Sequence, residues 1–157
     1  MAENRTVPTL FEWMGGQPAI DRLLASFYSR EPADPVLAPV FAGISPEHAQ
    51  HVAAFIAEVL GGPSRYSEER GGHPHMVGRH LGRMLTEAQR KRWVDLLLEC
   101  ADALEVPSDP EFRSALVGYL EWGTRLAVIN SQPGAAVDES APMPRWGWGD
   151  VKGPYLP

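Results

Sequence analysis

Four stretches of the chain carry apolar residues at helical spacing. In the first, Ile20, Leu23, Leu24, Phe27 and Tyr28 follow the i, i+3, i+4, i+7 pattern of an amphipathic helix. The other three apolar stripes are Val52, Phe55, Ile56, Val59, Leu60; Trp93, Leu96, Leu97, Cys100, Ala101, Leu104; and Phe112, Leu116, Tyr119, Leu120. No segment alternates with a period of two residues, so the pattern predicts an all-α fold without a sheet.

Helix start and stop signals agree with these stripes. Thr9 and Thr86 each stand three residues before a Glu or Gln, which is the spacing of a capping box. Ser45 and Asp109 each precede a proline, as an N-cap residue often does. The signals predict a short helix near 9–14, helices near 17–30, 46–60, 87–105 and 110–129, shorter turns near 34–39 and 75–81, and a long loop over 61–74.

The last part of the chain differs from the rest. Residues 131–157 contain nine Pro or Gly residues and no apolar stripe. We therefore expect one domain over 1–130 and an extended tail over 131–157. Trp146 and Trp148 in this tail could form a partner-binding motif or fold back over the domain. The second interpretation is favoured because exposed indole rings are costly.

Bulk composition narrows the functional classes. A chain of 157 residues with 44% hydrophobic residues suits a single domain with a sizeable core. The formal net charge of −6 argues against nucleic acid or an anionic membrane as a partner. No apolar run approaches the length of a membrane span, and the N-terminus lacks an apolar export segment. The single cysteine, Cys100, allows no internal disulfide, so we expect a cytoplasmic protein.

Histidines supply the candidate chemistry. His73, His75 and His80 have the spacing H-x-H-x4-H, which could be a zinc site. The nearest acids are Glu68 and Glu69, Cys100 lies on an apolar stripe, and the spacing matches no zinc signature. The alternative needs only one imidazole, His80, as an axial ligand to haem iron in an apolar slot. An isolated histidine is more often a surface or capping residue. The apolar stripes interrupted by Tyr28 and Trp93 favour the pocket interpretation.

A set of motifs occurs together between residues 9 and 130. They are Gly15-Gly16, Phe27-Tyr28, Phe41, Gly61-Gly62-Pro63, Tyr66-Ser67-Glu68, Arg70-Gly71-Gly72-His73-Pro74, Arg79-His80 and Trp93. Each motif is weak alone, but the combination resembles the group II truncated haemoglobins, globins of the two-over-two helical kind with a very short first helix. The resemblance implies a haem b cofactor, with oxygen and other diatomic molecules as ligands.

The resemblance also implies roles for individual residues. It makes His80 the proximal iron ligand and Tyr28 and Trp93 the donors to a bound ligand. His48 shares a helix face with Val52 and would be a third distal residue; the alternative is a solvated histidine near a helix start. The other cofactor contacts that it implies are Phe41, Val52, Tyr66, Met76, Arg79 and Leu85.

Three functional classes follow from these expectations. The first is a protein that reversibly binds oxygen for storage, scavenging or sensing. The second is a haem redox enzyme, either a nitric oxide dioxygenase or peroxidase-like, which would need an external electron donor because 157 residues leave no room for a reductase domain. The third is a haem-free helical interaction module that uses the tail. A monomer or a homodimer is expected in each case.

Overall fold

The computed structural model describes residues 6–149, and this part of the chain contains helices and loops but no strand. The elements are α1 (Leu10–Trp13), α2 (Gly16–Arg30), the 3-10 turn η1 (Glu31–Ala33), α3 (Ala38–Phe41), α4 (His48–Val59), α5 (Arg65–Arg70), α6 (Gly72–His80), α7 (Glu87–Ala103) and α8 (Pro110–Asn130). The prediction of an all-α fold is confirmed.

Side-chain caps begin several of these helices where the sequence placed them. Thr86 and Gln89 form a complete capping box at the start of α7. The carboxylate of Asp109 accepts a hydrogen bond from the backbone N–H of Phe112 at the start of α8. At α1 the Thr9 hydroxyl accepts a hydrogen bond from the backbone N–H of Glu12. Local sequence therefore sets these boundaries.

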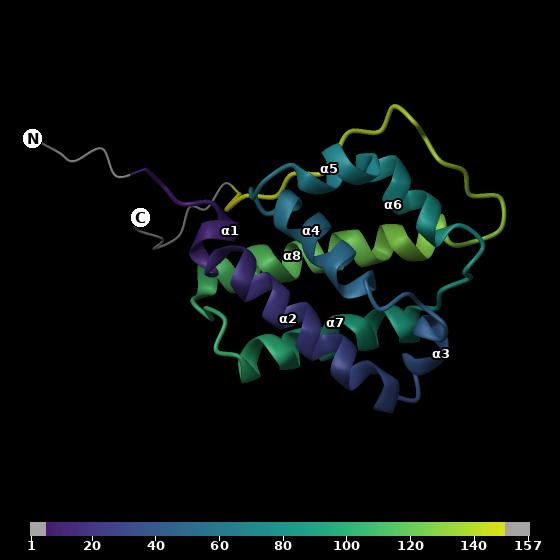
Figure 1. The fold of residues 1–157 in the computed structure, drawn as a ribbon, viewed down its shortest axis with the longest axis horizontal. Helices are drawn as coiled ribbons and strands as arrows, with labels where there is room; N and C mark the ends of the chain where they lie inside the picture. The colour runs from purple at the N-terminus through teal and green to yellow at the C-terminus, as the bar shows by residue number, and fades with distance from the viewer. Residues whose placement is uncertain (1–5, 150–157) are drawn as a thin grey trace, which may run out of the picture.

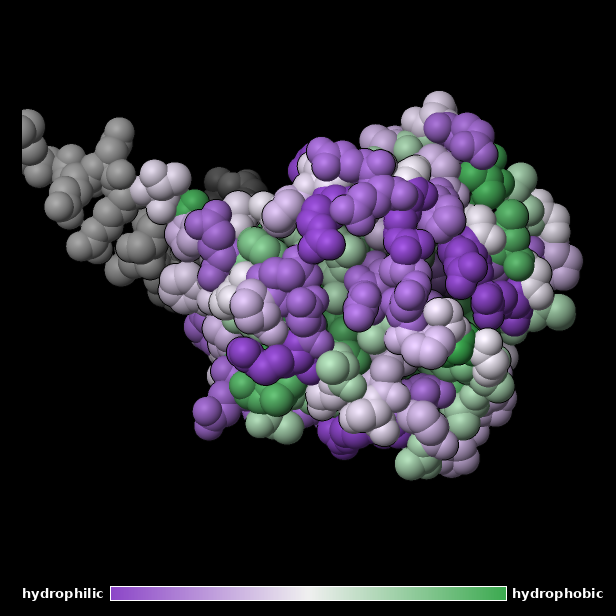
Figure 2. Space-filling model, viewed as in Figure 1, coloured by the Kyte–Doolittle hydropathy of each residue, from purple (hydrophilic) through white to green (hydrophobic). Residues whose placement is uncertain are grey.

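Two pairs of long helices enclose the core. α2 packs against α4, α7 packs against α8, and α2 also contacts α7. The apolar stripes of these helices face inward except at Leu104, which is 39% exposed at the end of α7, and Phe27 and Phe112 are fully buried. This is the two-over-two arrangement that the sequence predicted. In Figure 2, hydrophilic side chains cover much of the face over α4 and α5, with apolar side chains in smaller patches.

Two predicted boundaries are wrong. The expected loop over 61–74 contains α5 and the first residues of α6, separated by Gly71 in the left-handed region at φ 92°. A residue of another helix, Glu58 of α4, stabilises α5. Glu58 is 1% exposed and accepts hydrogen bonds from the backbone N–H and the hydroxyl of Ser67. α4 begins at His48, two residues after the expected start, and no side chain caps it.

The tail up to residue 149 folds back along the domain, as favoured from the sequence. The backbone N–H of Trp146 donates to the carbonyl oxygen of Val59 over 2.8 Å. The Trp148 indole N–H donates to the carbonyl oxygen of Pro8 over 2.7 Å. Residues 150–157 of the predicted tail lie outside the described residues. None of the described helices is long and apolar enough to cross a membrane.

Candidate functional site

A cavity of about 390 Å³ lies between α2, α4, α6, α7 and α8. Its volume falls within the range of roughly 300–1,000 Å³ typical of sites for small molecules and cofactors. Every site residue predicted from the sequence lines this one cavity. These residues are Tyr28, Phe41, His48, Val52, Tyr66, Met76, Arg79, His80, Leu85 and Trp93.

His80 ends α6 with its ring held in one orientation. Its Nδ1 atom lies 2.9 Å from the carbonyl oxygen of Met76, one helical turn earlier. A carbonyl can only accept, so Nδ1 carries the proton and Nε2 keeps a free lone pair. Burial lowers the pKa of His80, and the nearby charges of Arg83 and Arg79 lower it further. The hydrogen bond to Met76 acts in the opposite direction and raises it. His80 is therefore a neutral imidazole with one nitrogen available as a metal ligand.

An aromatic cluster lies across the cavity from α6. The Tyr28 ring stands edge-on to Phe41 and His48, with centroid distances of 5.3 and 5.2 Å. Burial strongly raises the pKa of the Tyr28 hydroxyl, and a side-chain hydrogen bond with Trp93 acts in the opposite direction. Tyr28 therefore stays a neutral phenol, able to donate a hydrogen bond. The Trp93 indole adds a second donor on the same cavity wall.

His48 has a lower pKa in the structure than an unperturbed imidazole. An unperturbed imidazole has a pKa of about 6.5. In the structure, burial lowers the pKa of His48 to about 4, with further lowering by the positive charges of Arg79 and His51. Between pH 5 and 8 His48 is therefore mainly neutral, so a titration centred near 6.5 is not expected for it.

The polar lining of the cavity is basic. All five histidines line it together with four arginines, whereas none of its described lining residues is Asp or Glu. Arg90 is neutralised by Glu87 and Glu121, at 2.5 and 3.2 Å. Arg79 and Arg83 form no ion pair with a described residue. A basic cavity in a chain of net charge −6 suits an anionic ligand.

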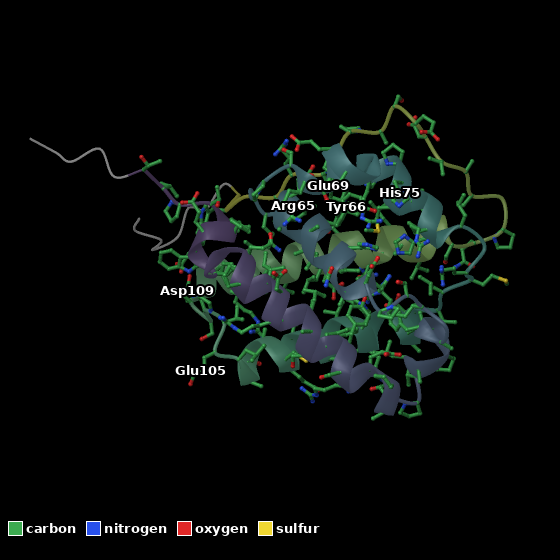
Figure 3. The ribbon with its side chains drawn as sticks, viewed as in Figure 1. Arg65, Tyr66, Glu69, His75, Glu105 and Asp109 are labelled. Atoms are coloured by element: carbon green, nitrogen blue, oxygen red, sulfur yellow. The ribbon has the colours of Figure 1, made fainter. Side chains whose placement is uncertain are left out.

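α5 contributes Tyr66 and Arg70 to the wall of the cavity. Tyr66 packs edge-on against Phe55, with a centroid distance of 5.0 Å, and burial raises the pKa of Tyr66 to about 12. Its ring also lies 6.0 Å from that of His75, and Figure 3 shows these two labelled side chains where α5 meets α6. Tyr66 is thus a neutral hydroxyl at the basic side of the cavity.

Several lining residues were not predicted as site residues from the sequence. Among them are Arg70, His73, Arg83, Arg90, Tyr119, Trp122 and Pro144. His73 is notable because its Nδ1 atom is buried and has no hydrogen-bond partner among the described residues. Tyr119 lies on a predicted apolar stripe, and this stripe was the sequence signal for the side of the cavity formed by α8. Pro144 reaches the cavity from the tail.

The zinc alternative gains no support. Within residues 6–149 no three His, Cys, Asp or Glu side chains come together in a way that could hold a metal ion. A haem requires one axial imidazole, apolar walls and cationic groups for its two propionates, and the cavity has all three. The residues present therefore fit a haem.

Comparison with known proteins gives matches to bacterial globins. A family model described as bacterial-like globin matches residues 9–121. The chain is 33% identical over 117 residues to the group 2 truncated hemoglobin YjbI of Bacillus subtilis, covering 74% of this chain and 86% of the relative. It is 40% identical over 75 residues to the group 1 truncated hemoglobin GlbN of Nostoc commune, covering 47% of this chain and 59% of the relative.

Solved structures show the same fold. The group II truncated hemoglobin from Bacillus anthracis is 30% identical, with a TM-score of 0.71 and coverage of 79% of this chain and 93% of its own. The truncated oxygen-avid haemoglobin from Bacillus subtilis is also 30% identical, with a TM-score of 0.68 and coverage of 77% and 99%. Both similarities leave about a fifth of this chain unmatched.

Proposed function

The chain belongs to the group II truncated haemoglobins of the bacterial-like globin family, and we propose that it holds haem b through His80 and binds diatomic ligands beside Tyr28 and Trp93. Membership of the family implies a haem cofactor and binding of oxygen. The observation that carries the proposal is the hydrogen bond from His80 Nδ1 to the Met76 carbonyl oxygen. This bond leaves the lone pair of Nε2 free to bind a metal.

A bound haem would supply an iron able to bind diatomic ligands, and His80 would be the residue that holds it. The Met76 carbonyl holds the ring of His80 and raises the basicity of Nε2. The neutral state of His80, favoured by burial, keeps that nitrogen available at neutral pH. Arg79, Arg83 and the Tyr66 hydroxyl provide the polar groups for the propionates.

Tyr28 and Trp93 act on the diatomic ligand. Both side chains line the cavity, and Tyr28 is a neutral donor because burial raises its pKa far above its usual range. A hydrogen bond to an acceptor that carries partial negative charge contributes roughly 1.5–3 kcal/mol. Two such donors favour slow release of oxygen. A relative from Bacillus subtilis is described as oxygen-avid, and we extend that property to this chain as part of the proposal.

Slow release suits oxygen storage, scavenging or sensing better than transport. A second function, redox chemistry on peroxide or nitric oxide, is favoured by His48. Its ring lies 5.2 Å from that of Tyr28, close to the proposed ligand site. Its lowered pKa of about 4 leaves the ring neutral at neutral pH but makes it a weaker base than an unperturbed imidazole. Turnover would require an external electron donor. The free, buried Cys100 suits a reducing compartment, so we propose the cytoplasm as its location.

Titration of the purified haem-free chain with haemin tests the proposed function. We expect saturation at one haem per chain, followed after reduction by a spectral change on exposure to oxygen or carbon monoxide. The rates of oxygen release and of peroxide consumption then separate the two functions. Absorbance that rises only as for free haemin in buffer would contradict the assignment.

A further inference from the structure

The segment 131–149, called the strap here, lies beyond the residues matched by the family model, which end at 121. It leaves the C-terminal end of α8, runs past α6 and α5 on the outside, and returns to α1 (Figure 1). The strap therefore joins regions on opposite sides of the cavity.

The first anchor of the strap, formed by Ser131 and Gln132, binds the backbone of Met84 and Leu85, a few residues after His80. Ser131 is fully buried; its hydroxyl accepts a hydrogen bond from the Leu85 N–H, and its carbonyl accepts one from the Met84 N–H, both over 2.9 Å. The side-chain amide of Gln132 donates to the Leu85 carbonyl, also over 2.9 Å. Leu85 lines the cavity, so this anchor positions one of its wall residues.

The middle of the strap lies against α6. The Val137 Cγ2 atom lies 3.8 Å from the position that a Cβ atom on Gly78 would occupy, which is ordinary van der Waals contact. Gly78 is two residues before His80. Among the described helices, α6 packs chiefly against α5 and α8. The strap thus covers a further side of the helix that carries His80.

The second anchor completes the cavity wall. Pro144 lines the cavity directly. The Trp146 ring lies 5.8 Å from Tyr119 and 5.6 Å from Trp122, two residues that line the cavity from α8. The Trp146 N–H donates to the carbonyl of Val59 at the end of α4. This anchor therefore joins the strap to α4 and α8.

The end of the strap is fixed near α1. Trp148 stands edge-on to Trp13 with a centroid distance of 5.6 Å, and its indole N–H donates to the Pro8 carbonyl. Backbone, side-chain and ring contacts thus hold the strap at both ends, although it contains no helix.

We propose that the strap is part of the cofactor-binding site and slows the loss of haem. It restrains α6 behind His80 and supplies Pro144 to the wall, so the cofactor can leave only after this segment yields. The inference rests on the proposed function, because it names a further contact of the same cavity. It adds to that function a retention element outside the residues matched by the family model.

Two shortened chains test the strap directly. The control ends at Gly149 and keeps every contact described above; the other ends at Pro133 and loses the second anchor while keeping Ser131 and Gln132. Each is loaded with haem, and transfer of haem to excess apomyoglobin is followed by absorbance. We expect transfer to be at least about tenfold faster from the chain ending at Pro133, since it loses several aromatic contacts. Equal transfer rates would overturn the inference.

Hydrogen exchange on the haem-free chains gives a second, independent measurement. We expect faster exchange in α6 of the chain ending at Pro133, with α2 unchanged. If that chain does not fold, the full chain with Trp146→Ala decides, with Trp146→Phe as the conservative control that keeps a ring. Haem transfer that is faster from Trp146→Ala than from Trp146→Phe supports the inference. Equal transfer rates for the two variants reject it. A full chain that takes up no haem instead rejects the proposed function.

Discussion

Replacing the two distal donors gives the most informative change in ligand kinetics. Tyr28→Phe and Trp93→Phe each remove one polar hydrogen and leave an aromatic ring in place. Tyr28 is packed against Phe27, Phe41 and His48, so the phenyl ring of the variant keeps its neighbours. Loss of a hydrogen bond worth roughly 1.5–3 kcal/mol corresponds to oxygen release about 10- to 150-fold faster.

The assay is stopped-flow displacement of oxygen by carbon monoxide from the reduced, haem-loaded protein. Because the two side chains act on one ligand and on each other, the double variant is expected to depart from the product of the single effects by a factor of about two or more. Trp13→Phe is the matched control, since its indole bonds to Asp109 away from the cavity. Unchanged release in both single variants would remove Tyr28 and Trp93 from the ligand site.

Three further changes test other parts of the account. Glu58→Ala is expected to lower the free energy of unfolding in urea by about 1–3 kcal/mol, because the partly buried N–H and hydroxyl of Ser67 lose their acceptor. Unchanged stability would contradict the role of Glu58 in holding α5. Burial lowers the pKa of His48 to about 4, so the free energy of unfolding of the haem-free chain should fall as the pH falls from about 6.5 toward 4. In His48→Leu this fall should be smaller, and an equal dependence on pH in the two chains would refute the prediction. Gly62→Ala should lower the melting temperature because a Cβ would lie 2.7 Å from a carbonyl oxygen, whereas Gly78→Ala, with no contact closer than 3.8 Å, should not; equal melting temperatures would contradict the packing.

The long helices could be predicted because each buries a stripe that repeats every turn. α5 could not, because its six residues are too short to show such a stripe. What holds it is the carboxylate of Glu58, which bonds to Ser67 from another helix. A contact of this kind depends on how two elements pack and leaves no local sign in the sequence.

The candidate site divides in the same way. His80, Tyr28 and Trp93 could be expected from motif spacing, and the structure brings them to one cavity. The lowered pKa of His48 could not be expected, because it depends on burial and on Arg79 from α6. The strap likewise carries no periodic pattern, so its course along α6 follows only from contacts made after the domain has folded.

Replacement of the iron ligand tests the central claim most directly. We expect His80→Gly to lose the spectrum of the reduced, haem-loaded protein and to regain it when imidazole is added, because imidazole can occupy the space left by the ring. His73→Gly, on the same helix and lining the same cavity, is the matched control and should keep the spectrum without imidazole. An unaltered spectrum in His80→Gly, or loss of the spectrum in His73→Gly alone, would contradict the assignment of His80 as the ligand.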